Sequence, residues 1–170
     1  GLVGSEMCIR DRPYNGWLNH TYYLEDGKML TDRFVLAEHN KDMTSYVGVD
    51  GKIQTGWIYD KRIEEWYYSE KDSTTGDCVC VSNCWKKING KWYYFFGSSM
   101  VSGYIMEIDG KLSEFAVDGS WKGYVTQKGW KQDDSGEWYY VEKDGTLCTE
   151  LQKINGKTYY FDDDGRMLKS

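Results

Sequence analysis

Short runs of aromatic residues alternate with short polar runs along most of the chain. The clearest case is residues 88–95, INGKWYYF, where Asn89 and Gly90 separate two runs rich in aromatic and β-branched side chains. Asn-Gly is the strongest two-residue signal for a type I′ turn, which joins antiparallel strands. Alternate residues of a strand point to opposite faces. The pattern therefore predicts a β-hairpin whose rings are divided between its two faces.

The same pattern returns at a nearly constant interval. Residues 154–161 read INGKTYYF, and aromatic triplets also begin at Trp66 and Trp138. The second tyrosine of each triplet, or the residue in its place, falls at Tyr23, Val47, Tyr68, Tyr94, Glu114, Tyr140 and Tyr160. The last four intervals are 26, 20, 26 and 20 residues, which suits a hairpin with a connecting loop and is too short for a pair of helices.

These intervals divide the chain into seven predicted units, each a hairpin with a loop. The units cover residues 16–33, 34–55, 56–83, 84–102, 103–128, 129–149 and 150–170. A single hairpin cannot bury its aromatic face, so its stability must come from stacking on its neighbours. No stretch shows a helical period of useful length. We therefore expect an all-β solenoid of hairpins with almost no helix.

The composition agrees with such hairpins and excludes some partners. Aromatic residues make up 16% of the chain, with 15 Tyr and 8 Trp, yet the mean hydropathy is −0.70, as expected where flat rings pack between polar turns. The formal net charge of −6 argues against nucleic acid, which needs clustered Lys and Arg. No run of about 18 apolar residues is present, so no membrane span is predicted.

The first residues differ in composition from the rest. Residues 2–12, LVGSEMCIRDR, resemble one reading frame of a transposase adapter used in shotgun sequencing libraries. We therefore interpret residues 1–12 as an adapter artefact, the alternative being a poorly ordered arm, and place the repeat domain at residues 13–170. On this interpretation the natural protein is truncated at its N-terminus, so a missing signal peptide or catalytic domain carries no information.

Metal-binding patterns are weak in this sequence. The cysteines at 78, 80, 84 and 148 lack the paired spacing of a structural zinc site, and His20 and His39 are remote from them in sequence. Residues 162–165, DDDG, lack the spaced ligands and terminal Glu of an EF-hand loop, and Asp-Gly serves turns directly. We predict no metal and no cofactor.

Catalytic patterns are weak as well. The chain has no G-x-S-x-G, H-E-x-x-H or P-loop motif, and acidic pairs such as Glu64-Glu65 and Asp133-Asp134 lie near predicted turns. Such pairs are usually solvated loop residues when no supporting constellation surrounds them. The chain as it stands is predicted not to be an enzyme.

The aromatic residues carry the functional signal. Trp57 and Trp66 are predicted to be cross-strand neighbours, and a Tyr of the next hairpin would add a third wall. Such a cage suits a quaternary ammonium, which ring quadrupoles hold by about 0.5–2 kcal/mol per contact, and the same ring faces could stack on a sugar. Packing alone is the alternative, and it applies to most middle tyrosines of the triplets. Packing could use Leu or Val, however, so the recurrence of Trp favours a ligand.

The pattern GW…WYY…DG-M resembles the choline-binding or cell-wall-binding repeats of Gram-positive surface proteins and of phage or autolysin lytic enzymes. INGK-YYF is also similar to the repeats of large clostridial toxins and glucan-binding glucosyltransferases. The resemblance covers residues 16–170. It implies a left-handed β-solenoid with choline sites between successive hairpins. Each site would use the Trp at the start of a hairpin, the first aromatic of its triplet and a Tyr of the following unit.

The resemblance assigns three candidate sites. They are Trp57 and Trp66 with Tyr94, Trp130 and Trp138 with Tyr160, and Trp85 and Trp92 with Glu114 in place of the Tyr. A carboxylate at the last position could itself attract a cation. The first and fifth units, opened by Trp17 and Tyr104, lack the other aromatic members of a site.

The resemblance implies a non-catalytic module, secreted to the cell wall or cell surface of a Gram-positive bacterium. It would anchor a larger protein to choline-bearing teichoic acid, with many weak sites acting by avidity. A module that binds cell-wall polysaccharide or another glycan is the first alternative. The others are the targeting half of a peptidoglycan hydrolase whose catalytic domain lies upstream, and a structural spacer.

Overall fold

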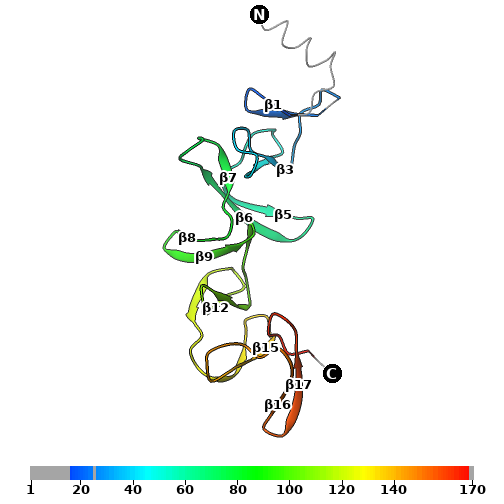
Figure 1. The fold of residues 1–170 in the computed structure, drawn as a ribbon. Helices are drawn as coiled ribbons and strands as arrows, with labels where there is room; N and C mark the ends of the chain where they lie inside the picture. The colour runs from blue at the N-terminus through cyan, green and yellow to red at the C-terminus, as the bar shows by residue number, and fades with distance from the viewer. Residues whose placement is uncertain (1–15, 25, 169–170) are drawn as a thin grey trace, which may run out of the picture. The chain divides into compact units, whose positions relative to one another are not determined.

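The computed structural model describes residues 16–24 and 26–168. The segment interpreted as an adapter, residues 1–12, lies outside them. The described residues form seventeen strands and no helix (Figure 1), and this part of the chain therefore holds no helix that could cross a membrane. The strands are β1 (Gly16–Leu18), β2 (Thr21–Tyr23), β3 (Arg33–Leu36), β4 (Thr44–Val47), β5 (Gly56–Asp60), β6 (Glu65–Lys71), β7 (Cys78–Cys80), β8 (Cys84–Ile88), β9 (Lys91–Phe96), β10 (Ser99–Met100), β11 (Ile105–Ile108), β12 (Lys111–Phe115), β13 (Trp121–Tyr124), β14 (Gly129–Gln132), β15 (Trp138–Val141), β16 (Glu150–Ile154) and β17 (Lys157–Phe161).

The strands of the described residues form seven small sheets that follow one another along the chain. Four are two-stranded (β1–β2, β3–β4, β14–β15, β16–β17) and three have a third strand (β5–β6–β7, β8–β9–β10, β11–β12–β13). The predicted all-β class built from consecutive hairpins is confirmed. The number of repeats in the family sense and the left-handed coil of the array stay predictions.

Turn chemistry explains why these segments form hairpins. Asn89 and Gly90 have φ angles of 49° and 81°, and Asn155 and Gly156 have the same values. Positive φ at both central residues defines the type I′ turn, whose twist matches that of the flanking strands. The hairpins predicted at residues 88–95 and 154–161 therefore have the expected turn.

The strand register corrects the predicted alignment of three units. In β5–β6, Trp57 lies opposite Tyr68. The corresponding pairs in the first, second and fifth hairpins are Trp17–Tyr22, Phe34–Tyr46 and Ile105–Glu114. The triplet positions expected at Tyr23 and Val47, and the first-strand position expected at Tyr104, are therefore each one residue off. In the second hairpin the turn, which fixes the register, is longer and runs from Leu36 to Thr44. The first and fifth hairpins have two-residue turns like the one at Asn89-Gly90, so their shifts come from where the aromatic residues stand in the strands.

The described chain divides into two compact units. Of the described residues, the first unit holds those up to Asn83 together with Gly97–Ser99, and the second holds Cys84–Phe96 together with those from Met100 onward. In the first unit Tyr46, Ile58 and Cys80 form a buried cluster. In the second unit three small clusters lie between successive hairpins; one of them joins Leu112 of β12 to Tyr139 of β15. Small clusters between neighbours are what a stacked array of hairpins requires.

Candidate functional site

Three hairpins each carry two tryptophans at right angles. The ring centroids are 6.1 Å apart in Trp57–Trp66, 6.5 Å in Trp85–Trp92 and 6.3 Å in Trp130–Trp138, with planes at 88°, 85° and 85°. We call each such pair a tryptophan corner. Both members of a corner lie on one hairpin and on one face of it, so the corner forms without help from another hairpin.

The two indoles of a corner are diagonal neighbours, not direct cross-strand partners. Trp57 pairs with Tyr68, and Trp66 pairs with Tyr59. The prediction that Trp57 and Trp66 are cross-strand neighbours is confirmed, with the two rings meeting diagonally and not directly opposite each other. A diagonal step brings residues to about 7–8 Å between backbones, within reach of two large rings, and it leaves room for the perpendicular arrangement.

The most complete cage lies in the second unit. Trp85, Trp92, Trp121 and Tyr124 line a cavity of about 330 Å³. Trp121 stands 5.7 Å from Trp85 with the planes at 77°, and Tyr124 stands 5.0 Å from Trp121, again at 77°. Successive walls are therefore close to perpendicular, and the four rings form a box that is open on one side.

Trp121 and Tyr124 were not predicted as site residues. They come from β13, the third strand of the fifth hairpin sheet. The signal that could have found them is the pair Trp121-x-x-Tyr124 inside a stretch that the repeat pattern treats as a loop. The fifth hairpin lacks the aromatic residues of the pattern, and its extra strand supplies rings instead.

Two contacts hold Trp121 and Trp85 in this arrangement. The Trp121 indole Nε1 donates a hydrogen bond to Ser113 Oγ at 3.2 Å. Phe115 is fully buried and lies 5.7 Å from Trp85 with the planes only 27° apart. Ser113 and Phe115 alternate on the same face of β12. The small Ser113 therefore leaves the space that the indole occupies.

Glu114 does not belong to this cage. Its side chain is buried and lies 2.8 Å from the ammonium of Lys122 and 3.0 Å from that of Lys131. Lys122 is also 2.6 Å from Asp134, and the hydrogen bonds that it donates to Asp134 and Glu114 raise its pKa above the ordinary value. The Glu114 carboxylate, which could have attracted a ligand cation, is thus already paired with Lys122 and Lys131.

A positive charge does lie at the edge of the cage. The ammonium of Lys111 sits 5.0 Å from the centre of the Tyr124 ring, a distance at which the ring quadrupole attracts a cation. One face of Tyr124 is therefore engaged by the protein itself.

The corner at Trp130 and Trp138 meets the last hairpin through unexpected residues. Trp130 lies 4.8 Å from Tyr159 at 70° and 5.9 Å from Phe161 at 33°. The predicted partner, Tyr160, is paired with Leu151 and about half exposed. Since Tyr159 and Phe161 share one strand face and Tyr160 points to the other, the ring packed against Trp130 is that of the middle tyrosine. A ligand role for Tyr160 stays a prediction.

The corner at Trp57 and Trp66 is widened by a residue that the sequence analysis overlooked. Tyr59 is exposed and lies 5.0 Å from Trp66 with the planes at 40°, while Tyr68 lies 5.2 Å from Trp57. Tyr94, the predicted third member, belongs to the second unit, and its part in this site stays a prediction.

Tyr139 shows that a middle tyrosine can be structural, as predicted. It is fully buried, and its hydroxyl donates a hydrogen bond of 2.8 Å to Asp133 Oδ2. Burial and the neighbouring Asp133 carboxylate raise the pKa of this phenol. The ring fills the core, and its polar end has a partner.

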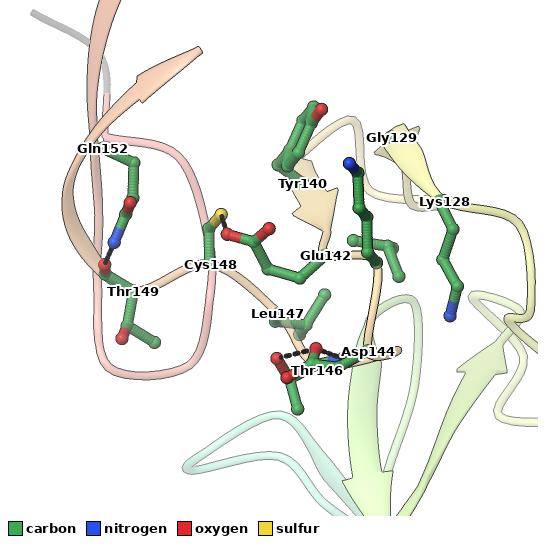
Figure 2. A pocket seen from close by; sticks show the side chains of 12 residues that line it. Lys128, Gly129, Tyr140, Glu142, Asp144, Thr146, Leu147, Cys148, Thr149 and Gln152 are labelled. Carbon is green, nitrogen blue, oxygen red and sulfur yellow. Dashed lines mark hydrogen bonds between the residues drawn. The ribbon is translucent and has the colours of Figure 1, made fainter.

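A second cavity of the same unit is larger and more polar. It has a volume of about 770 Å³ and is lined in part by Lys128, Tyr140, Glu142 and Gln152. Figure 2 shows the Cys148 thiol directed at Glu142, to which it donates a hydrogen bond of 2.8 Å. Burial and this bond raise the pKa of Cys148 to about 12, so the thiol stays protonated at neutral pH and serves as a donor.

Comparison with known proteins matches two kinds of repeat to parts of this chain. Residues 148–170 match the choline-binding repeat, and residues 85–99 and 128–147 match the cell wall binding repeat. The corners at Trp85–Trp92 and Trp130–Trp138 lie inside the matched residues.

Full-length relatives are much longer than this chain. Glucosyltransferase-S of Streptococcus mutans is 30% identical over 164 residues, which are 96% of this chain and 10% of that protein. Glucosyltransferase-I of Streptococcus downei is 26% identical over 87% of this chain and 9% of that protein. The crystal structure of choline binding protein F from Streptococcus pneumoniae is 24% identical, with 91% of this chain and 52% of that one covered, at a TM-score of 0.47. The chain thus spans about a tenth of the length of the curated relatives that it matches.

Proposed function

Because the chain carries choline-binding and cell-wall-binding repeats and is a cell-wall- or carbohydrate-binding repeat module, we propose that it anchors a larger secreted protein to choline-bearing teichoic acid of a Gram-positive cell wall. The recurrence of one perpendicular tryptophan corner in three hairpins carries the proposal. Packing demands apolar volume, but it does not demand the same ring geometry three times.

The geometry suits a compact cation. Two perpendicular indoles present two π faces to one point, and a trimethylammonium group can contact both faces at once because its charge is spread over a near-spherical surface. A quaternary nitrogen has no N–H to donate, so a wall of rings satisfies it without hydrogen-bond acceptors. The cavity lined by Trp85, Trp92, Trp121 and Tyr124 contains no carboxylate and needs none for this ligand.

The module acts by itself as a non-catalytic binder under this proposal. Each corner contributes a weak site, and several sites on one polymer raise the overall affinity through effective concentration. The catalytic or surface function then belongs to the rest of the protein that the module anchors, including a peptidoglycan hydrolase if one lies upstream.

Elution from an amine resin by free choline tests the proposal, together with a titration of tryptophan fluorescence. We expect retention of the chain on the resin, release by choline, and a saturable fluorescence change. Trp92→Ala removes an exposed cage wall, and Phe96→Ala, which changes an exposed ring of the same strand outside this cavity, is its matched control. Retention that choline does not reverse, or equal binding by both variants, would overturn the proposal.

A carbohydrate ligand is the second candidate, and three observations favour it. Lys111 already places a positive charge over Tyr124, which repels a cation but not a neutral sugar. The larger cavity offers hydroxyl, amide, ammonium and carboxylate groups to sugar hydroxyls, and the long relatives are glucosyltransferases. Retention on dextran or on choline-free cell wall, without competition by choline, would select this candidate over the first.

A further inference from the structure

The only two histidines of the chain both lie in hairpin turns of the first unit, and each meets a carboxylate. His20, in the turn between β1 and β2, has its Nδ1 2.8 Å from Glu38 Oε2. His39, in the turn between β3 and β4, has its Nδ1 2.7 Å from Asp77 Oδ1. Glu38 and His39 are adjacent in sequence, so the two pairs meet at one place.

Three potential ligand atoms converge there. One atom each of Glu38, His39 and Asp77 lies within 4.8 Å of the other two. Tetrahedral zinc with bonds of about 2.0–2.2 Å to nitrogen and oxygen holds its ligand atoms roughly 3.3–3.6 Å apart, so Glu38 must come closer while His39 Nδ1 and Asp77 Oδ1, now 2.7 Å apart, must separate a little. Small rotations of the Glu38 and His39 side chains, both at a turn, supply that movement.

The backbone around the cluster is firmly held. Asp77 is nearly buried, and its Oδ2 accepts a hydrogen bond of 2.7 Å from the His39 backbone N–H. Burial raises the pKa of the Asp77 carboxyl, but the hydrogen bonds from His39 outweigh it and the pKa is lowered. Ser45 Oγ donates to the Cys78 carbonyl at 2.7 Å, which ties β4 to the start of β7 beside Asp77. A ligand set fixed by its surroundings binds with less ordering cost.

The site is open to solvent on one side and carries negative charge. The His39 side chain is 55% exposed, whereas the side chains of Glu38 and Asp77 are 19% and 6% exposed. The nearest lysine, Lys41, directs its ammonium to the carbonyls of Ala37 and Glu38 at 3.1 and 3.2 Å. Its hydrogen bonds are thus made to the backbone, and the two carboxylates have His20 and His39 as their partners.

We propose that Glu38, His39 and Asp77 bind a divalent transition metal, with zinc as the preferred ion, and that His20 positions Glu38. One imidazole nitrogen and two carboxylates form a set that zinc accepts, with the fourth place left to water. Calcium and magnesium favour sites made of oxygen alone. The Glu38–His20 contact is of the kind that orients a metal-binding carboxylate.

Metal binding at this site exchanges a proton for an ion. The His39 ring nitrogen that binds the metal must carry no proton, so metal binding competes with protonation of that nitrogen. No oxidation step is involved. The metal would link the turn between β3 and β4 to the loop before β7, residues that are 38 positions apart in sequence.

Cobalt and zinc titrations of the whole chain test the proposal. We expect one Co²⁺ to bind with the visible absorption of a four-coordinate ion, to be displaced by Zn²⁺, and to raise the melting temperature. Asp77→Asn and Glu38→Gln should each weaken binding by more than about 100-fold, and His20→Gln by about 10-fold, as expected for a supporting residue. Asp144→Asn, which changes a carboxylate that caps a turn of the second unit, is the matched control.

Three results would overturn the proposal. Absence of binding at micromolar metal is the first, and a sulfur-to-cobalt charge-transfer band, which assigns the ion to cysteines, is the second. Equal affinity of the parent chain and Glu38→Gln is the third. Because Asp77→Asn could also unfold the turn, Glu38→Gln with unchanged circular dichroism keeps the test decisive. The choline and carbohydrate assays are independent of every one of these outcomes.

Discussion

Trp121 is bound to Ser113 by a hydrogen bond from its indole Nε1 to the serine hydroxyl, across the two strands β13 and β12. Ser113 occupies the middle position of the fifth hairpin, where other hairpins have a tyrosine such as Tyr139 or Tyr159. The indole therefore takes the place of a missing ring, and it reaches that place from a different strand. This relationship completes the cage around Trp85 and Trp92.

Ser113→Ala is expected to loosen that cage. Removal of the hydroxyl leaves the half-buried indole N–H without its acceptor, which costs about 1–2 kcal/mol of unfolding free energy. We also expect weaker choline binding because Trp121 is less fixed. Chemical denaturation and fluorescence titration measure the two effects, and Ser102→Ala, an exchange of a half-buried serine outside the cavity lining, is the control. Unchanged affinity in Ser113→Ala would show that the hydrogen bond does not position the wall.

Trp92→Ala is expected to reduce choline affinity without a matching loss of stability. Trp92 is 42% exposed, so its removal creates little cavity, while a lost cation–π contact is worth about 0.5–2 kcal/mol, or roughly 2- to 30-fold in affinity. Calorimetry and a thermal melt of the same sample separate the two quantities. A large drop in melting temperature with intact binding would favour a packing role.

Glu114→Gln distinguishes electrostatic attraction of a ligand from an internal ion pair. Because Glu114 contacts Lys122 and Lys131, we expect the variant to lose unfolding free energy. The expected loss is only about 1 kcal/mol, because solvent screens ion pairs with partly exposed lysines. Choline affinity should stay the same, since the carboxylate is already neutralised. A drop in choline affinity with unchanged stability contradicts this assignment. Titration of the variant and the parent at two salt concentrations provides the measurement.

Tyr139→Phe tests the buried hydrogen bond to Asp133. Asp133 keeps the backbone donors of Ser135 and Glu137, both at 2.9 Å, so we expect a loss of about 1–3 kcal/mol rather than unfolding. Urea denaturation measures this loss, and Tyr160→Phe, at an exposed ring, is the control. Equal stability of the two variants would mean that the bond contributes nothing.

Alkaline pH is expected to destabilise the fold through buried phenols. Burial and hydrogen bonding raise the pKa of Tyr139, and burial with the Asp32 contact raises the pKa of Tyr46 to about 12, from an ordinary 10.0. A raised folded pKa means that the stabilisation is fully present below the unfolded value and is lost as pH rises above it. Unfolding free energies measured at about pH 9 and pH 11 should therefore fall in the parent chain, and less so in Tyr139→Phe.

Local chemistry made much of the fold predictable. Asn89-Gly90 and Asn155-Gly156 specify their turns by themselves, and the strands on either side follow from alternation. Register was predictable only where the turn was regular. In the second hairpin the longer turn shifts the pairing so that Phe34 meets Tyr46, and counting along the aromatic residues does not reveal such a shift.

The candidate site was predictable within a hairpin and less so between hairpins. Both indoles of a corner follow from one repeat, but the residue that the next hairpin presents depends on which strand face meets the preceding one. Tyr159, not Tyr160, packs on Trp130. Trp121 lies in a segment that the repeat pattern treats as a loop. His39 and Asp77 are 38 positions apart in sequence, and the sequence does not show which distant turns come into contact.

Each tryptophan corner is made by residues only seven to nine positions apart, as in Trp85–Trp92 and Trp57–Trp66. Under the proposed function, half of a binding site is therefore encoded in a single hairpin. Gain or loss of one hairpin in evolution changes the valency of the array in whole steps and leaves the remaining half-sites intact. The ligand that one site prefers can change through substitutions in a single hairpin, such as those at Ser113 and Trp121. An array of hairpins can therefore combine sites for different ligands while keeping the same backbone fold.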